Sequence, residues 1–445
     1  MKKHSEKSYI KYIVSLILVP AMLLGGCMKG PLTEPSRVET VDDTAAAGES
    51  EAIDETEAVE EAEKVSEEPA DGLRLCSTVT SPDALGENAI CGTCINQADL
   101  NDERIMELIY EHFNAVTLEN VLKPDAMFGY HNDHVPAQSI HEEELNGTAI
   151  SVPTLDHSRA DAILDAIAKH NTDCPDRPIR VRGHVLVWHQ QTPEWFFHVD
   201  YDKDKDYVSA DEMNRRMEWY IKTMLEYYTG EGSKYRDLFY GWDVVNEAVS
   251  DRSGTYRNHT EGSSWWKVYN SSEYIPNAFI YANKYAPVDL DLYYNDYNEC
   301  DKKKKEGILT LINDVKSAEG ARLDGFGMQA HYTVNAPAAE AIDLAAREYA
   351  QAAGKVMLTE LDVKASMFYR GTAEDRPKEY DRQAGYYKSI YDVLKKLHKD
   401  GIDLAGLSFW GVTDTRSWLG SSHCPLLFDG QYKAKPAFYG FFPSS

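Results

Sequence analysis

The chain has 445 residues and a formal net charge of −27, from 46 basic and 73 acidic side chains. Hydrophobic residues make up 43% of it, which is enough for a sizeable core, and the length suits one large domain with appendages. The acidic excess argues against nucleic acid as a partner, because binding phosphates requires clustered Lys and Arg side chains.

The first 27 residues have the pattern of a secretory leader. Four lysines within the first eleven residues precede the apolar run IVSLILVPAMLL, which is short for a membrane-spanning helix. The run ends in LLGGC at residues 23–27, and this ending resembles the bacterial lipobox, where cleavage leaves a lipid-modified cysteine. We therefore expect residues 1–27 to be a lipoprotein signal peptide, with Cys27 lipidated and the protein anchored outside the cytoplasmic membrane. The alternative is a plain signal peptide with an incidental cysteine.

Residues 28–72 have the composition of a linker. Between Thr33 and Glu68 there are fourteen acidic and two basic residues, and residues 28–72 contain no aromatic side chain. Such a segment cannot bury enough apolar surface to offset its ordering entropy, so we expect a disordered, self-repelling tether. The folded domain is then expected over residues 73–445.

Six cysteines follow Cys27, and outside the cell they could pair in ways that the sequence does not reveal. Cys91 and Cys94 form a single CxxC without a second CxxC or a spaced histidine pair, so we expect no zinc site there. His184 and His189 are five residues apart on a predicted strand, which places them on opposite faces. We expect neither a metal nor another cofactor.

From residue 73 onward, β-rich apolar runs alternate with stretches of helical periodicity. The runs predicted as strands are 89–96, 113–120, 179–189, 240–248, 289–298, 323–332, 355–363 and 403–414. The stretches predicted as helices include 102–113, 156–171, 209–228, 305–320, 338–354 and 379–401, and Ser209 with Glu212 forms a capping box for the third of them. Eight alternating strands in about 370 residues favour a (β/α)8 barrel, an α/β fold of the TIM-barrel type. An open doubly wound sheet is the alternative.

Polar side chains gather where these predicted strands end, which is where barrels of this type carry their active sites. Carboxylates, neutral hydrogen-bonding groups and tryptophans in such positions are typical of a sugar site, because indoles stack on sugar faces and polar groups bind hydroxyls. The candidates in chain order are Glu119, Asn120, Lys123, His184, Trp188, Asn246, Glu247, Asn295, Tyr297, Gln329, His331, Glu360, Asp362, Trp410 and Trp418.

Seven segments together resemble the signatures of glycoside hydrolase family 10, the endo-β-1,4-xylanases. In chain order they are FNAVTLENVLKP, RGHVLVWHQQTP, WDVVNEA, YYNDYN, GFGMQAHY, LTELDV and FWGVTDTRSW, and the resemblance extends from about residue 89 to the C-terminus. It implies a retaining mechanism with Glu247 as acid/base and Glu360 as nucleophile. Retaining carboxyl pairs lie about 5–5.5 Å apart, with distinct environments that keep one protonated and the other ionised.

The same resemblance implies support roles for the other candidates. His331 and Asp362 match the chain beside the nucleophile, and Asn246 matches the donor to the 2-hydroxyl of the sugar being cleaved. The residues that match contacts to xylose units on the non-reducing side are Glu119, Asn120, Lys123, His184, Trp188 and Gln329. Trp410 and Trp418 are expected to cover that end of the cleft, and Asn295 and Tyr297 to line the leaving-group side.

Other interpretations remain open at this point. The stretch 130–157 is longer than the usual connection after the second strand and matches no motif, so it is taken as an insertion. The expected partners are xylan and xylo-oligosaccharides, and a monomer is expected. Alternatives are a β-1,4-glucanase on the same barrel, a non-catalytic surface xylan-binding lipoprotein, or a solute receptor of a transport system.

Overall fold

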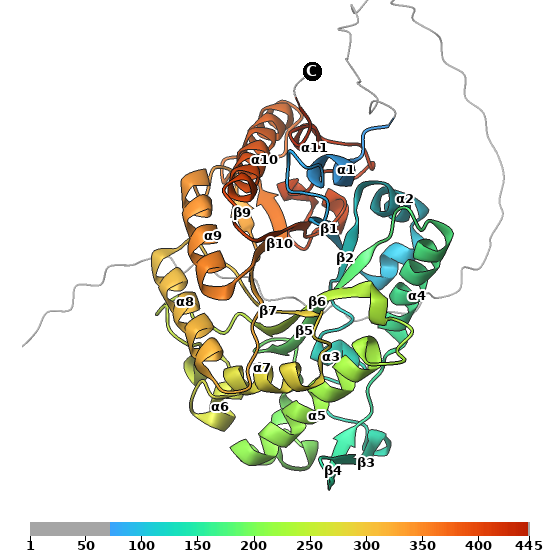
Figure 1. Ribbon diagram of the computed structural model, residues 1–445, viewed down its shortest axis with the longest axis vertical. Coiled ribbons are helices and arrows are strands. Elements are labelled where there is room, and N and C mark those ends of the chain that lie inside the picture. Colours follow the sequence, from blue (N-terminus) through green and yellow to red (C-terminus); the bar gives the residue numbers. More distant parts are fainter. Residues whose placement is uncertain (1–71, 444–445) are drawn as a thin grey trace, which may run out of the picture. The chain divides into compact units, whose positions relative to one another are not determined.

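The computed structural model describes residues 72–443 of the chain (Figure 1). The predicted signal peptide with Cys27, and the acidic segment up to residue 71, lie outside the described residues and stay predictions. The domain boundary expected at residue 73 also stays a prediction.

Eight parallel strands form a closed barrel, as predicted. Neighbours pair in the order β11-β1-β2-β5-β6-β7-β8-β10, and β10 pairs with β11 to close the sheet. Closure excludes the open doubly wound alternative and gathers the carboxyl ends of all eight strands around one opening. The strands are β1 Ile90–Ile95, β2 Ala115–Leu118, β5 Arg180–Trp188, β6 Phe239–Asn246, β7 Asp291–Asp296, β8 Gly325–Met328, β10 Val356–Lys364 and β11 Leu404–Phe409.

One predicted strand is interrupted. The run 323–332 contains β8 and then a separate short strand, β9 (His331–Thr333), which pairs with β10 beyond the barrel wall. Between them Ala330 has a φ of 59°, a left-handed conformation that breaks the ladder after Gln329. This break brings Gln329 and His331 to two different glutamates of the site described below.

Helices follow the strands and surround the barrel (Figure 1). Most of the long helices coincide with the predicted periodic stretches, because each buries one apolar face on the sheet. The helix Tyr274–Tyr285 lies in none of those stretches. The helices are α1 Leu75–Val79, α2 Glu103–His112, α3 Pro124–Met127, α4 Ser158–Asp173, α5 Ala210–Thr229, α6 Ser264–Tyr269, α7 Tyr274–Tyr285, α8 Lys302–Ser317, α9 Ala339–Ala353, α10 Asp375–Lys399 and α11 Pro436–Tyr439. Short 3-10 helices occupy Gln97–Asn101, Ala137–Ser139, Glu194–Phe197, Val199–Tyr201, Arg236–Leu238, His259–Glu261, Asp414–Arg416 and Ser421–His423.

Only half of the predicted capping box at α5 forms. The Ser209 side chain accepts a hydrogen bond from the Glu212 amide and so caps the helix. The Glu212 carboxylate pairs with Arg216 at 3.1 Å, one helical turn ahead. The carboxylate thus takes a charged partner, and the Ser209 cap stands without its reciprocal bond.

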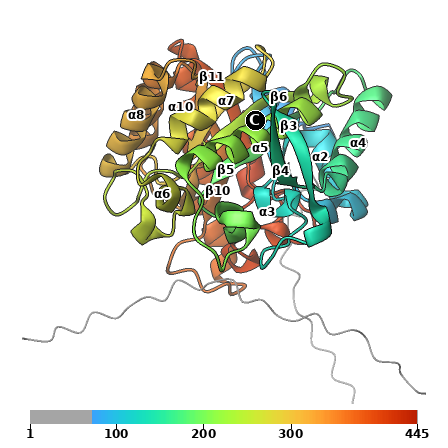
Figure 2. The ribbon, with the colours of Figure 1, turned by 90° about the horizontal axis from the view of Figure 1, so that it is seen from below.

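The insertion after β2 folds as a β-hairpin of β3 (Ile140–Leu145) and β4 (Thr148–Pro153). Both views place it beside α5 (Figures 1 and 2). The Trp219 indole of α5 donates to Glu143 at 2.9 Å, and Ile150 and Val152 are buried. The hairpin is therefore attached to the outer helix layer through both polar and apolar contacts.

A buried tryptophan fills the barrel wall between β5 and β6. Trp242 is 0% exposed, and a Cβ atom added at Gly183 would lie 2.1 Å from its ring. Glycine is therefore required at position 183, directly before His184, and burial of the indole contributes about 5 kcal/mol by area.

Within residues 72–443 no helix is long and apolar enough to cross a membrane.

Candidate active site

Glu247 is the first residue after β6, and its backbone turns sharply there. Its φ of 53° is left-handed, a conformation that costs a non-glycine residue about 1–3 kcal/mol. Three bonds hold the turn: the Glu247 amide donates to the Asn295 carbonyl at 2.9 Å, the Ala248 amide to the Tyr294 hydroxyl at 3.0 Å, and Arg257 Nε to the Glu247 carbonyl at 3.1 Å. The strand end is thus fixed in the one orientation that these contacts allow.

The Glu247 carboxyl group is buried and surrounded by few donors. Trp188 Nε1 donates to it at 3.0 Å and Gln329 Nε2 at 3.1 Å. Burial, followed by the negative charge of Asp296, raises the pKa of Glu247 to about 7, and these two donors only partly oppose the effect. The group therefore carries its proton in weakly acidic solution.

Glu360, on β10, lies in the opposite electrostatic environment. Asn295 Nδ2 donates to one of its oxygens at 2.7 Å and His331 Nε2 to the other at 3.2 Å. Burial alone would raise the pKa of Glu360, but the His331 hydrogen bond and the charges of His184, His331 and Arg182 outweigh it and lower the pKa to about 2. Between about pH 2 and 7, Glu360 is accordingly ionised while Glu247 is protonated.

A chain of three amides connects the two glutamates. Gln329 donates to Glu247 and also to Asn246 Oδ1 at 3.2 Å, while Asn295 donates to Glu360 and to the same Asn246 oxygen at 3.0 Å. Because Asn246 Oδ1 accepts both bonds, the amide nitrogen of Asn246 is left as its donor end. The amides thus join Glu247, directly after β6, to Glu360 within β10, 113 residues further along the sequence.

His331 links Glu360 to two further predicted residues. Its Nδ1 lies 3.0 Å from Asp362, which also accepts from Trp418 Nε1 at 2.9 Å. Burial opposes the imidazolium form, but the adjacent Asp362 and Glu360 carboxylates raise the pKa of His331 well above its ordinary value. Trp418 is 59% exposed, whereas Trp410 is buried edge-on to the rings of His184 and His331.

The residues after β2 form a second group of polar contacts. Lys123 Nζ donates to Asn120 and to Gln191, both at 3.0 Å, and lies 5.0 Å from the centre of the Trp188 ring. Burial lowers the pKa of Lys123, although Glu360 and Glu119 oppose this. Glu119 accepts from Asn96 at 3.2 Å. Trp188, which also bonds Glu247, joins this group to the paired glutamates.

Asn295 and Tyr297, the two residues expected to line the leaving-group side, have their hydrogen-bond partners within the protein. Asn295 is 0% exposed and lies between Asn246, Glu360 and Thr359, so its contacts are with the glutamate pair. The Tyr297 hydroxyl donates to Asp251, and the Lys304 ammonium lies 4.3 Å from its ring centre. These contacts do not test the expected place beside the leaving group, which stays a prediction for both residues.

Sequence reasoning missed a buried ion network beneath the site. Arg182, 0% exposed on β5, donates to Asp243 at 2.7 Å and to the Thr359 carbonyl at 2.9 Å, and His184 Nδ1 lies 2.7 Å from the same Asp243 oxygen. Asp243 thus holds His184 through Nδ1, and the expected contact of His184 with a xylose unit stays a prediction. A charged residue inside the apolar run IRVRGHVLVWH was the available signal, since a buried charge requires a partner.

Among the described residues, the cysteines and histidines form no metal-binding group. The six cysteines of the described chain are all free thiols, with Cys91 and Cys94 buried in β1. No group of three metal-ligating side chains occurs within residues 72–443. His189 carries no partner at its buried Nδ1, and burial followed by the charge of Arg257 lowers its pKa to about 3.

Two linked carboxyl groups, one protonated and one ionised between about pH 2 and 7, meet the requirements for acid-assisted cleavage of a glycosidic bond. On a (β/α)8 barrel with indoles and amides around the pair, they define the protein as a glycoside hydrolase.

Comparison with known proteins gives the family. The model of glycosyl hydrolase family 10 matches residues 83–443, and the chain belongs to that family. An endo-1,4-beta-xylanase of Geobacillus stearothermophilus is 32% identical over 380 residues, which are 82% of this chain and 98% of that protein. Endo-1,4-beta-xylanase Y of Acetivibrio thermocellus is 32% identical over 362 residues, but the chain spans only 30% of its length.

Solved structures agree with this placement. An intracellular xylanase from Thermoanaerobacterium saccharolyticum has a TM-score of 0.67 and 29% identity, with 84% of this chain and 99% of that chain covered. A Clostridium thermocellum endo-1,4-beta-D-xylanase in complex with xylohexaose has a TM-score of 0.69 and 30% identity, with 83% and 67% covered.

Proposed function

We propose that this protein is a retaining endo-1,4-β-xylanase that hydrolyses internal bonds of xylan. The observation that carries the proposal is the divergence of the two linked glutamates, with a pKa of about 7 for Glu247 and about 2 for Glu360. Family 10 relatives named xylanases support the choice of substrate.

The proposed reaction has two displacements. Glu360 attacks the anomeric carbon as the glycosidic carbon–oxygen bond breaks, and Glu247 gives its proton to the departing oxygen. A covalent glycosyl ester on Glu360 results, with its negative charge removed. Because the charge of Glu360 is one contribution that raises the pKa of Glu247, that pKa falls in the intermediate. Glu247 then takes a proton from water, which attacks the ester and releases the sugar.

The remaining predicted residues take supporting roles in this proposal. Asn246 donates its free amide to the 2-hydroxyl, and His331 and Asp362 orient Glu360. Asn295 takes a positioning role, given its bonds to Asn246 and Glu360. Xylose units on the non-reducing side bind through Glu119, Asn120, Lys123, Trp188 and Gln329, with the exposed Trp418 covering them. His184, held by Asp243, is also proposed to contact a xylose unit.

Product stereochemistry tests this mechanism. Xylo-oligosaccharide hydrolysis is followed by proton NMR from the first minutes, before mutarotation equilibrates the anomers. The proposal predicts that β-product appears first. Initial α-product would mean inversion and would refute the double displacement.

A glucan-cleaving activity is the competing assignment, since one family relative, 31% identical over 350 residues, is named an exoglucanase. Initial rates on xylan and on carboxymethylcellulose separate the two, and we expect xylan to be cleaved faster. Faster cleavage of the glucan would overturn the substrate assignment. A purely xylan-binding protein would bind xylan as tightly in Glu247→Gln as in the wild type while neither released any reducing sugar.

We also propose that Cys27 carries a lipid anchor that holds the enzyme outside the cytoplasmic membrane, on the strength of the LLGGC segment and its apolar run. Cells fed a labelled fatty acid should incorporate it into the wild-type protein and not into Cys27→Ser. Equal labelling of both proteins would refute the anchor.

A further inference from the structure

A buried aspartate lies next to the acid/base candidate without belonging to the predicted site. Asp296, the last residue of β7, is 0% exposed. It accepts hydrogen bonds from Lys304 Nζ at 2.9 Å, from the Tyr297 amide at 2.9 Å and from the Tyr294 hydroxyl. Burial raises the pKa of Asp296, and these three donors oppose that effect by stabilising its ionised form.

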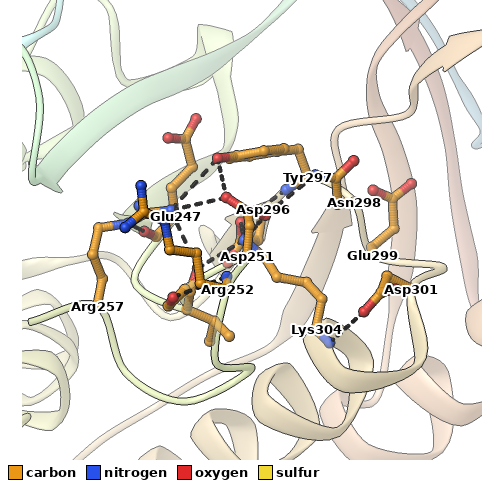
Figure 3. A network of polar contacts seen from close by, with 12 residues as sticks. Glu247, Asp251, Arg252, Arg257, Asp296, Tyr297, Asn298, Glu299, Asp301 and Lys304 are labelled. Atoms are coloured by element: carbon orange, nitrogen blue, oxygen red, sulfur yellow. Dashed lines mark hydrogen bonds and ion pairs between the residues drawn. The ribbon is translucent and has the colours of Figure 1, made fainter. Parts of the chain in front are cut away.

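Lys304 connects this aspartate to the backbone that follows Glu247. It extends from α8, is 1% exposed, and donates to the Val249 carbonyl at 2.7 Å and to Asp251 at 3.1 Å as well as to Asp296. Figure 3 shows these groups gathered around the loop after β6, where Arg257 binds the Glu247 carbonyl. One ammonium group therefore ties together β7, α8 and the turn that carries Glu247.

A purely structural role would not require these charges. Burying an ion pair costs several kcal/mol of desolvation, and well-packed apolar residues are often at least as stabilising. The charges add an electrostatic field that acts on the Glu247 carboxyl group. Of the charged neighbours, the Asp296 carboxylate contributes most to the environment of the buried Glu247 carboxyl, and Lys304 balances that carboxylate from the far side.

We infer that Asp296 and Lys304 are positioning residues that act as an opposed charge pair, Asp296 holding the Glu247 proton in place and Lys304 limiting how tightly it is held. The inference rests on the proposed role of Glu247 as acid/base. Other charged or titratable groups facing Glu247 are Lys123, Asp251, Arg257, Tyr297 and Glu360, and none of them bonds both Asp296 and the backbone after Glu247.

The two charges predict shifts of opposite sign. Asp296→Asn removes the anion, so Glu247 ionises more easily and its titration moves down by about one pH unit. Glu247 and Asp296 titrate as a coupled pair, and the Lys304 cation favours their ionised forms. Lys304→Met removes that cation, so the pair loses its last proton at higher pH. The alkaline limb of kcat/KM moves in the same two directions, since it reports the acid of the free enzyme.

Lys305→Met is the matched control. Lys305 is the next residue of α8 and is also ion-paired, at 2.6 Å, but its partner is Glu348 on α9. Lys305→Met removes the same charge as Lys304→Met, by the same change of side chain on the same helix. It leaves the contacts of Asp296 intact. The control should change neither the titration of Glu247 nor the alkaline limb.

The experiment measures the titration of Glu247 directly by carbon-13 NMR of the full chain labelled at glutamate carboxyls, with Glu247→Gln identifying the signal. Opposite shifts in the two variants, and none in the control, support the inference. Unchanged titrations, or shifts of the same sign in both variants, overturn it; if Asp296→Asn does not fold, Lys304→Met decides. The alkaline limb of kcat/KM separates the charge-pair inference from the proposed role of Glu247. If the titration of Glu247 shifts and the limb does not, the acid/base role of Glu247 is refuted.

Discussion

Asp362→Asn tests how the site keeps Glu360 ionised. Glu360 has a pKa of about 2 against 4.5 for an ordinary glutamate, which corresponds to about 3 kcal/mol of preference for the ionised form. His331 supplies part of it through a bond of 3.2 Å, and Asp362 at 3.0 Å favours the charged form of His331. A charge-assisted hydrogen bond is worth about 1.5–3 kcal/mol, so loss of the imidazolium should raise the pKa of Glu360 by about 1 to 2.

The assay is kcat/KM on an aryl xylobioside from pH 2.5 to 8. The ionised form of Glu360 is fully populated above its pKa and is lost as the pH falls through it. The wild type should therefore show no acid limb above pH 3, whereas Asp362→Asn should lose half its activity between about pH 3 and 4. Asp291→Asn, at the other end of the barrel, is the control, and circular dichroism confirms folding. An acid limb that stays in place in Asp362→Asn would refute this account of Glu360.

Three further predictions concern single contacts. Glu247→Gln should lower kcat/KM on xylan by about 10²–10⁴-fold and by less on aryl substrates with acidic leaving groups, which need no proton; equal losses would contradict the acid role. Gln329→Leu removes a donor that favours ionised Glu247, so the alkaline limb should rise by about half to one pH unit; a fall would contradict the geometry. Glu143→Ala removes the partner of the Trp219 indole, so urea unfolding should show a loss of about 1 kcal/mol, with kcat unchanged; a loss of activity would instead give the hairpin a functional role.

Alternation of strand and helix patterns in the sequence was sufficient to predict the barrel. Each of the eight apolar runs contains a barrel strand, because a parallel strand buried on both faces needs a continuous run of apolar residues. The β3–β4 hairpin was not predicted as strands. Its strands expose half of their side chains, and the contacts that fix it, such as Trp219 to Glu143, come from a helix 76 residues away.

The sequence predicted the site residues at the carboxyl ends of the strands, but not the buried charged residues beneath the site. Position at the end of a predicted strand is a local property of the sequence, and it led to Glu247 and Glu360, although β10 continues to Lys364. The partners of Asp243 and Lys304, Arg182 on β5 and the Val249 carbonyl after β6, come from neighbouring elements of the barrel and are distant in sequence. Asp296 contacts Tyr294, Tyr297 and Lys304, all within eight residues of it, but nothing in that pattern shows that it is buried near Glu247. Asn295 was expected on the leaving-group side, and in the structure it bonds Asn246 and Glu360.

The most direct test of the account is to trap the covalent intermediate. A 2-fluoro xylobioside with an activated leaving group slows hydrolysis of the glycosyl ester, and peptide mass spectrometry then locates the label. The account predicts a single fluoro-xylobiosyl ester on Glu360, together with a fall in the pKa of Glu247 in the trapped enzyme. A label on any other residue, or turnover of the compound without a covalent adduct, would contradict it.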